Sequence, residues 1–254
     1  MDKMKELVDG LLSTESLPVP FLQRINEALL KEYRLSAGGF LTVLPKEVEI
    51  YYVNKEGAAP YVDTNMHCML DPRTNDEIWG LQAGRFGQVY CHRKGLGGLD
   101  VCLSDSDDYA LCCTIKAAEI NGEECWSPLK VRNTVLDKIC EHEGTDRAIV
   151  MERMNEKRSM TFLSRREYPL TDDVYHLHRK GLRRRDKYAR LPLRSFTDLW
   201  NNKLQINRMQ KVSLYMNAHP GENVLDVLRQ HGFRYIPLEI RIRYKIDNKI
   251  KLYE

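Results

Sequence analysis

The stretch EVEIYYV, residues 47–53, decides how the fold of this chain is interpreted. Its apolar and aromatic residues predict a buried β-strand. Side chains alternate between the two faces of a strand, so Glu47 and Glu49 are expected to share one face. A buried carboxylate is costly unless it is paired or used. The stretch therefore predicts a strand that carries an ion-paired or functional glutamate.

The bulk properties predict an ordinary globular protein. The chain has 254 residues, of which 43% are apolar, and this is ample for a hydrophobic core. No apolar run is long enough to span a bilayer, and the acidic N-terminal stretch lacks the pattern of a secretory signal. The seven cysteines are odd in number and form no C-x-x-C pair, which argues against a disulfide framework and a zinc ribbon. We expect a cytoplasmic monomer, nucleoid-associated if bacterial, without membrane contact.

The net charge of +3 conceals an asymmetry between the two halves of the chain. Residues 1–126 contain 12 basic and 20 acidic residues, whereas residues 127–254 contain 27 basic and 16 acidic residues. The densest basic segment, residues 179–190, holds seven basic residues and one acid. A strongly cationic half favours a polyanionic partner, nucleic acid first. A solubilising surface that balances the acidic half is the alternative interpretation.

The apolar periodicity predicts helices at both ends of a strand-rich region. Residues 3–12, 20–33 and 129–142 have helical spacing, and Gly144 is expected to end the last of these helices. Between residues 40 and 120, short β-branched and aromatic segments alternate with turn residues. The links between them are too short for crossover helices, which favours antiparallel pairing.

The last third of the chain gives three further expectations. Thr171 is a capping signal at the start of a basic segment, and residues 222–232 predict a short helix that ends at Gly232. Residues 235–246, YIPLEIRIRYKI, alternate apolar and charged residues and predict a strand. The fold class expected is α+β, a single domain with a curved antiparallel β-sheet and flanking helices. Its parts are a helical segment over 1–39, a core over 40–205 and a helix–strand extension over 206–254 that packs on the same domain.

Four features follow one another between residues 47 and 122. EVEIY at 47–51 comes first, followed by His67 and by Arg73, Thr74 and Asn75. A hairpin-like segment, GRFGQVYCHRKGLGGLDVCLS, spans 84–104, and CTIKAAEING spans 113–122. YARLPLRSF occupies 188–196. Each motif is weak by itself, and their joint order carries the signal.

In this order the chain resembles the alkyladenine (3-methyladenine) DNA glycosylase family over roughly residues 40–200. That family carries E-T-E-A-Y on a strand, a pocket histidine, a T-P-R-N segment, V-Y-x-x-Y-G-M-x-x-x-x-N and L-x-R-A-L-E-P. A late W-x-R-K-P-L-R-F resembles residues 188–196. The spacing from Tyr90 to Asp100 equals the family's spacing from its tyrosine to its asparagine. The resemblance implies a hydrolase that flips a damaged or modified base out of double-stranded DNA and cleaves its N-glycosidic bond.

The resemblance also implies roles for particular residues. Glu49 would activate the attacking water, and Lys116 would stand where the family has an arginine that helps hold that water. Tyr51, His67, Tyr90 and Asp100 would bind the extruded base. Positively charged residues would contact the DNA: Arg73, Arg93 and Lys94 near the pocket, and Arg183, Arg184 and Arg185 in the basic segment. The reaction requires no cofactor and no metal.

Three positions depart from the family pattern. Arg93 occupies the place of the tyrosine that the family inserts into the duplex. Asp100 replaces an asparagine, and an ionised carboxylate only accepts hydrogen bonds, so a base edge that donates is expected to be preferred. Lys116 replaces an arginine, and a carboxylate nearby is expected to keep it charged. These changes affect the choice of substrate more than the class of reaction.

Other interpretations remain open for the same residues. Glu49 could be a solvent-facing residue of an edge strand, and Tyr51 and Tyr90 could be core aromatic residues. His67, Cys68, Cys91 and His92 could bind a metal, although no second pair has ligand spacing. Gly95, Gly97 and Gly98 are more typical of a tight hairpin than of a nucleotide-binding loop. For the whole chain, the alternatives are a nucleic-acid or nucleobase-binding module of the same fold without catalysis, or an unrelated α+β protein.

The basic segment yields the first testable prediction. Replacing Arg183, Arg184 and Arg185 by glutamate should weaken DNA binding equally for all sequences, because phosphate contacts carry no sequence information. The slope of log affinity against log salt should flatten by about one unit for each phosphate that the variant no longer neutralises. Titration of labelled duplexes at several salt concentrations measures both effects. Unchanged binding at low salt would identify the segment as ordinary surface.

Overall fold

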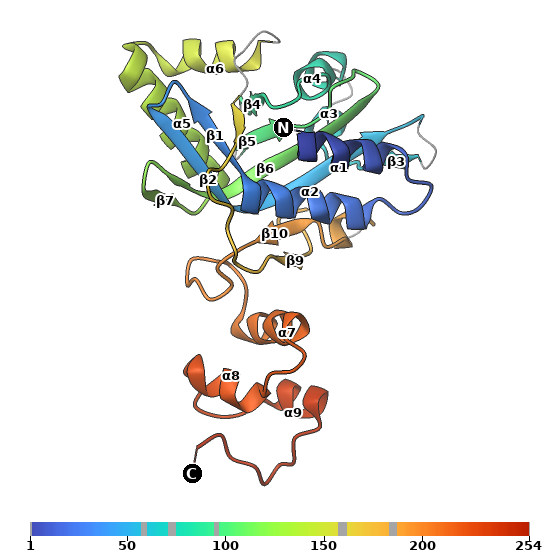
Figure 1. Cartoon of the computed structure of the whole chain (residues 1–254), viewed down its shortest axis with the longest axis vertical. Helices are drawn as coiled ribbons and strands as arrows, with labels where there is room; N and C mark the ends of the chain where they lie inside the picture. The colour runs from blue at the N-terminus through green and yellow to red at the C-terminus, as the bar shows by residue number, and fades with distance from the viewer. Residues whose placement is uncertain are drawn as a thin grey trace. The chain divides into compact units, whose positions relative to one another are not determined.

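The computed structural model describes residues 2–56, 60–70, 75–93, 97–156, 162–182 and 187–253, apart from the side chains of residues 2, 70 and 75–78. The chain divides into two compact units, Met1–Thr197 and Asp198–Glu254. The larger unit contains the whole β-sheet, and the smaller unit is helical in its described residues. Each unit is described separately below (Figure 1).

Two long antiparallel strands form the centre of the larger unit. β2 (Leu41–Asn54) pairs with β6 (Tyr109–Ile120) along almost its whole length. The register shifts on either side of Glu47, which marks a β-bulge. Residues 40–53, expected from sequence as two short strands, therefore lie in one strand.

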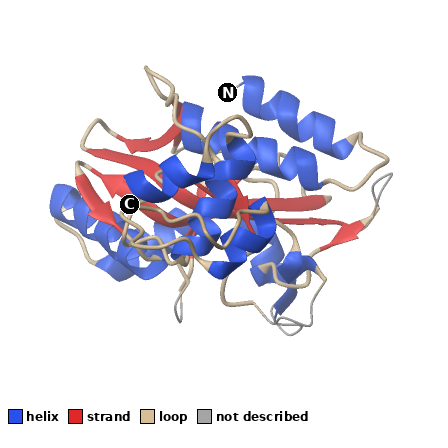
Figure 2. Cartoon of the chain, turned by 90° about the horizontal axis from the view of Figure 1, so that it is seen from below, coloured by secondary structure: helices blue, strands red, loops and turns tan. Residues whose placement is uncertain are grey.

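Shorter strands extend the sheet on both sides of this pair. On the free edge of β6 lie β5 (Leu99–Cys102), β4 (Val89–Cys91) and β7 (Glu123–Cys125). On the other edge of β2 lie β1 (Tyr33–Ala37), β10 (Arg194–Phe196) and β3 (Tyr61–Val62), with β8 (Leu163–Arg165) beside β1 and β9 (Tyr175–Leu177) beside β10. All described pairings are antiparallel and the sheet is not closed, which confirms the expected α+β class with a large antiparallel sheet (red strands in Figure 2).

One face of the sheet carries the main hydrophobic core. Ile50, Ile115 and Val101 are fully buried there among residues of α1 (Asp2–Leu12), α2 (Val19–Glu32) and α5 (Pro128–Glu143). The three helices confirm the sequence-based expectation. Ser127 caps α5 by accepting a 3.0 Å hydrogen bond from the Lys130 amide, and Gly144 ends it in the left-handed conformation with φ of 64°.

The opposite face of the sheet is covered by short helices. α3 (His67–Leu70) and α4 (Asn75–Gln82) contribute to a second cluster in which Cys68 packs near Tyr90, Cys102 and Cys112. α6 (Arg147–Asn155) adjoins β4, where the Asn155 side chain bonds both the N–H and the C=O of Cys91 at 2.8 and 2.9 Å. A small second core thus lies on the face that also carries the polar residues described below.

The smaller unit packs three helices around a core of its own. α7 (Arg208–Ala218), α8 (Val224–Gln230) and α9 (Leu238–Tyr244) bury Val212, Leu228 and Ile240 together. α8 confirms the helix expected over 222–232, and Gly232 follows it with φ of 65°. Among the described residues of both units, no helix has the length and apolar character needed to cross a membrane.

Two sequence-based expectations are wrong. Residues 235–246 were expected to form a strand, but α9 occupies 238–244 because Ile236 and Ile240, one helical turn apart, both enter the core of the smaller unit. No helix follows the capping signal at Thr171. The chain there is irregular and then enters β9, which pairs with β10. Tertiary pairing overrides the local signal in both places.

Candidate functional site

A single row of side chains crosses the sheet from β4 to β10. Residues directly opposite in register are, in order, Tyr90 and Asp100, Asp100 and Thr114, Thr114 and Glu49, and Glu49 and Arg194. Opposite residues of paired strands project from the same face. Tyr51 and Lys116 stand two residues from Glu49 and Thr114, so they project from this face as well. The register therefore gathers polar groups that are far apart in sequence.

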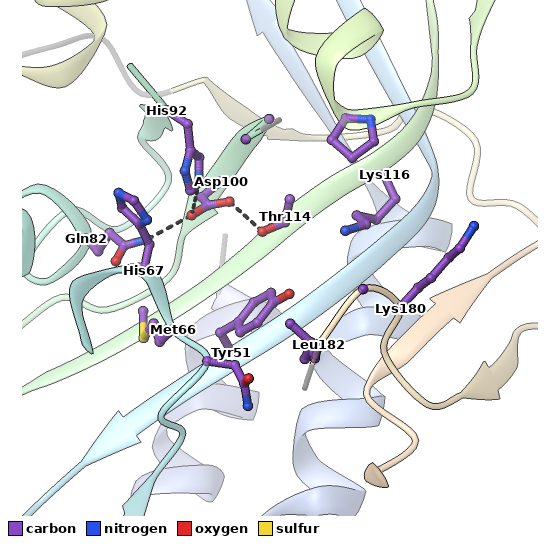
Figure 3. Close-up of a pocket in the computed structure, with 15 residues that line it drawn as sticks. Tyr51, Met66, His67, Gln82, His92, Asp100, Thr114, Lys116, Lys180 and Leu182 are labelled. Atoms are coloured by element: carbon purple, nitrogen blue, oxygen red, sulfur yellow. Dashed lines mark hydrogen bonds and ion pairs between the residues drawn. The ribbon is translucent and has the colours of Figure 1, made fainter. Parts of the chain in front are cut away.

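A cavity of about 390 Å³ lies on this face of the sheet (Figure 3). Its volume falls within the range of roughly 300–1,000 Å³ typical of small-molecule sites. The sheet, α3, α4, the β4–β5 connection, the start of α5 and the segment 180–182 all contribute to its wall. The lining residues are Tyr51, Asn65, Met66, His67, Gln82, His92, Gly97, Gly98, Asp100, Thr114, Lys116, Pro128, Lys180, Gly181 and Leu182.

Asp100 is the most heavily hydrogen-bonded group in the cavity wall. Gln82 Nε2 donates to its Oδ2 at 2.8 Å, and His92 Nε2 lies 2.9 Å from the same oxygen. Thr114 Oγ1 donates to Oδ1 at 2.5 Å. Figure 3 shows these three contacts converging on the carboxylate. A carboxylate offers about four acceptor positions, so three are filled from within the chain and about one remains for a ligand.

His92 and Asp100 form a charged pair inside the protein. Burial by itself would raise the pKa of Asp100, but the charge and hydrogen bond of His92, with the Thr114 hydroxyl, outweigh burial and lower the pKa. Burial by itself would lower the pKa of His92, but the Asp100 charge and hydrogen bond outweigh it and raise the pKa. Each partner thus stabilises the charged form of the other.

Glu49 is held by a second set of contacts. Its side chain has no exposed surface, and Lys116 Nζ lies 2.9 Å from Oε2. The Tyr51 hydroxyl donates to Oε2 at 3.0 Å, and the Lys180 backbone N–H donates to Oε1 at 2.8 Å. Burial and then the Glu49 charge raise the pKa of the Tyr51 hydroxyl well above its ordinary value, so the phenol remains a donor. Glu49 is therefore a paired buried carboxylate rather than a solvent-facing residue of an edge strand.

The segment that covers Glu49 is fixed by a buried ion pair. The side chains of Arg179 and Asp63 both have no exposed surface, and the guanidinium bonds both carboxylate oxygens. Arg179 also donates to the backbone oxygens of Ile50 and Tyr188, and its guanidinium lies 4.6 Å from the ring centre of Tyr51. Arg179, the first residue of the basic segment, is thus internal and orients the Lys180 amide toward Glu49.

The predicted site residues divide into three groups. Tyr51, His67, Asp100 and Lys116 line one cavity, as the order of the motifs implies. Glu49 and Tyr90 are buried and do not line it, although the Tyr90 ring centre lies 5.9 Å from that of His67. Arg93 is exposed in the β4–β5 connection. Arg73, Lys94, Arg183, Arg184 and Arg185 lie outside the described residues.

Four residues of the site escaped the sequence-based prediction. His92 follows Tyr90 by two residues and Thr114 precedes Lys116 by two, so strand alternation could have placed both beside predicted residues. Gln82 and Lys180 come from a helix and a loop, where no sequence period indicates direction. The ring centres of His67 and His92 are 4.7 Å apart, but no cluster of three His, Cys, Asp or Glu side chains in the described residues could hold a metal ion.

Another polar network lies in the larger unit, away from the cavity wall. His176 Nδ1 lies 2.8 Å from Ser195 Oγ and His176 Nε2 lies 2.9 Å from Glu27 Oε1. These residue types match those of a catalytic triad. Ser195, however, is fully buried in β10, accepts a 2.9 Å hydrogen bond from Asn26, and does not line the cavity. The network ties α2 to the sheet.

No protein-family model matches this chain. A search of curated proteins likewise finds no similar sequence. The resemblance to the alkyladenine glycosylase family stays a prediction.

The pair of His92 and Asp100 makes stability depend on pH. The pKa of His92 is raised on folding, so its contribution is present below the unfolded pKa and lost as pH rises through the folded pKa. The pKa of Asp100 is lowered, so its contribution is lost as pH falls through that value. Urea unfolding should therefore show His92→Gln costing most at about pH 5 and least at about pH 9.

A matched variant separates this effect from simple loss of a hydrogen bond. Thr114→Val removes a donor to the same carboxylate without removing a titrating group. Its cost should be constant over the range in which His92 titrates. A cost of His92→Gln that is equally constant would contradict the charged pair.

Proposed function

We propose that this protein is a DNA glycosylase that takes a modified base from duplex DNA into the cavity and hydrolyses its N-glycosidic bond. The observation that carries the proposal is the convergence of Tyr51, His67, Asp100 and Lys116 on one cavity. These residues belong to separate motifs that follow one another in the order of the glycosylase family. Coincidental matches would have no reason to meet at one place.

The cavity has the properties that a flipped base requires. A base removed from the stack loses its aromatic neighbours and needs flat side chains and a few polar contacts in exchange. Tyr51, His67 and His92 supply rings, and the amide of Gln82 and the carboxylate of Asp100 supply polar atoms. Arg93, exposed in the β4–β5 connection, is the candidate to enter the space that the base leaves.

Glu49 is the candidate for water activation. Three of about four acceptor positions on its carboxylate are filled, which leaves about one, on Oε1, for a water molecule. The carboxylate would take a proton from this water, and its charge would stabilise the oxocarbenium-like sugar as the bond breaks. Lys116, paired to Oε2, would hold the carboxylate in place. The proposed reaction uses water alone.

One observation favours a second function, binding of a nucleobase without hydrolysis. The Glu49 side chain has no exposed surface, and the Lys180 amide covers Oε1. A water molecule could reach the carboxylate only if the segment at Lys180 shifts when a ligand binds. A binding module would need no such shift. The two functions therefore differ in whether native protein releases a base or only retains it.

The glycosylase proposal predicts the effect of one isosteric substitution. Glu49→Gln should reduce base release by about 10²–10⁴-fold, because an amide keeps the shape but cannot act as a base. A panel of modified-base duplexes, treated with alkali after incubation, reveals abasic sites. The matched control is Glu47→Gln, since Glu47 bonds Arg194 Nε at 2.6 Å and does not line the cavity.

The outcomes distinguish the candidates. Full release by Glu49→Gln would transfer the role to Glu47 or Glu56. Retention of a modified base without release by native protein would identify a binding module. If native protein neither binds nor releases any base, the glycosylase proposal fails.

Lys116 provides a test of the reaction class. Paired with Glu49 as an ammonium ion, it has no lone pair with which to attack the sugar, so the reaction should be purely hydrolytic. Borohydride added during turnover should therefore trap no covalent protein–DNA adduct. An adduct in native protein that disappears in Lys116→Arg would instead establish a Schiff base at this lysine.

A further inference from the structure

We propose that His92 is the proton donor to the leaving base, and that the substrates which need it are neutral bases with a hydrogen-bond acceptor on their edge. This inference rests on the proposed glycosylase function and deepens it. The sequence alone indicates His92 only as a possible metal ligand. Its position in the wall of the cavity, its pairing with Asp100 and its unoccupied ring nitrogen carry the argument.

The imidazole of His92 is rigidly placed. Its backbone N–H donates to Gly98 O at 3.2 Å, and its backbone oxygen accepts from Arg132 Nη1 at 2.9 Å. A Cβ at Gly97 would lie only 2.5–2.7 Å from atoms of the His92 side chain, so this backbone packs directly against the imidazole. A proton donor must hold its geometry to be effective, and these contacts supply that constraint.

The two ring nitrogens of His92 have different surroundings. Nε2 is engaged by Asp100 Oδ2 at 2.9 Å. Nδ1 has no hydrogen-bond partner among the described residues, while the residue itself lines the cavity. Engagement of Nε2 by the carboxylate leaves Nδ1 as the nitrogen from which an imidazolium can donate to a ligand.

The groups around His92 determine its charge. Asp100 on β5 faces it directly, Lys116 on β6 and Arg132 on α5 add positive charge, and the rings of His67 and Tyr90 lie 4.7 and 4.9 Å from its own. Burial and the two cations act to lower the pKa of His92, whereas Asp100 acts to raise it and prevails. Asp100 is thus a positioning residue that keeps the imidazole protonated.

The chemical step balances without another reactant. As the C1′–N bond breaks, its electron pair stays with the base, which takes the proton from His92 Nδ1 at a ring nitrogen or an exocyclic oxygen. Water attacks C1′ and gives its proton to Glu49. The base then leaves as a neutral molecule. His92 is left neutral and Glu49 protonated, and proton exchange with solvent restores both.

This step matters for one class of base only. A neutral base must leave as an anion unless it is protonated, so a proton donor lowers the barrier. A cationic N-alkylated base already carries the positive charge that bond cleavage neutralises, and it gains little from a donor. His92 therefore extends the reaction to neutral bases.

The experiment compares two duplexes, one with hypoxanthine as the neutral base and one with 7-methylguanine as the cationic base. His92→Gln keeps a donor for Asp100 but has no acidic proton. It should slow hypoxanthine release by about 10²-fold and 7-methylguanine release by less than about threefold. His142→Gln, at a residue stacked on Phe40 outside the cavity, is the matched control and should leave both rates unchanged.

The pH profile gives an independent readout that needs only native protein. Hypoxanthine release should fall as pH rises through the pKa of His92, and 7-methylguanine release should lack this fall. Asp100→Asn should move the fall to lower pH, because the carboxylate that raises the pKa of His92 is removed.

The possible failures are distinguishable. Equal losses on both duplexes in His92→Gln, or the same pH profile for both bases in native protein, would overturn the role of His92 and leave the glycosylase intact. Release of neither base by native protein would overturn the glycosylase and this inference together.

Discussion

The antiparallel pairing of β2 with β6 is the constraint on which the rest of the molecule depends. Because side chains alternate along both strands, one register puts Ile50 and Ile115 into the main core and puts Glu49 and Thr114 on the opposite face. A slip of one residue would exchange the two sets. The same apolar contacts that stabilise the larger unit therefore hold the site in place, and the site needs no separate support.

The polar face contains two buried carboxylates, and each has its own cation. Glu49 is compensated by Lys116 and Asp100 by His92. Isolated burial of either charge would cost several kcal/mol, on the order of the penalty for an unpaired buried ion. A core of apolar residues could be as stable, so pairing alone does not explain why the charges are there. Their position beside a cavity is consistent with a role in chemistry.

Sequence reasoning succeeded where one period was unambiguous. The helices at 2–12, 19–32 and 128–143 and the antiparallel character of the sheet follow from spacing and short connections. It failed at 235–246, because alternation of apolar residues places Ile236 and Ile240 on one side of a helix as well as on one side of a strand. Only packing against Leu228 and its neighbours decides between the two.

The candidate site was predictable in part for the same reason. Strand residues such as Tyr51, Asp100 and Lys116 inherit their direction from the sheet. Gln82 and Lys180 approach from a helix and a loop, where direction depends on long-range contacts that local sequence does not encode. The burial of Arg179 within a basic segment is another case, since only its contact with Asp63 removes it from the surface.

The close packing of Gly97 against the imidazole has a consequence for recognising relatives of this protein. Any side chain at that position would displace His92 or the backbone beside it, so the two residues can change only together. A distant homologue with the same cavity should carry histidine and glycine five residues apart between two short paired strands. Homologues that have lost the histidine should be free to vary at the glycine, and this linked variation would mark the lineage in which the cavity acquired its present chemistry.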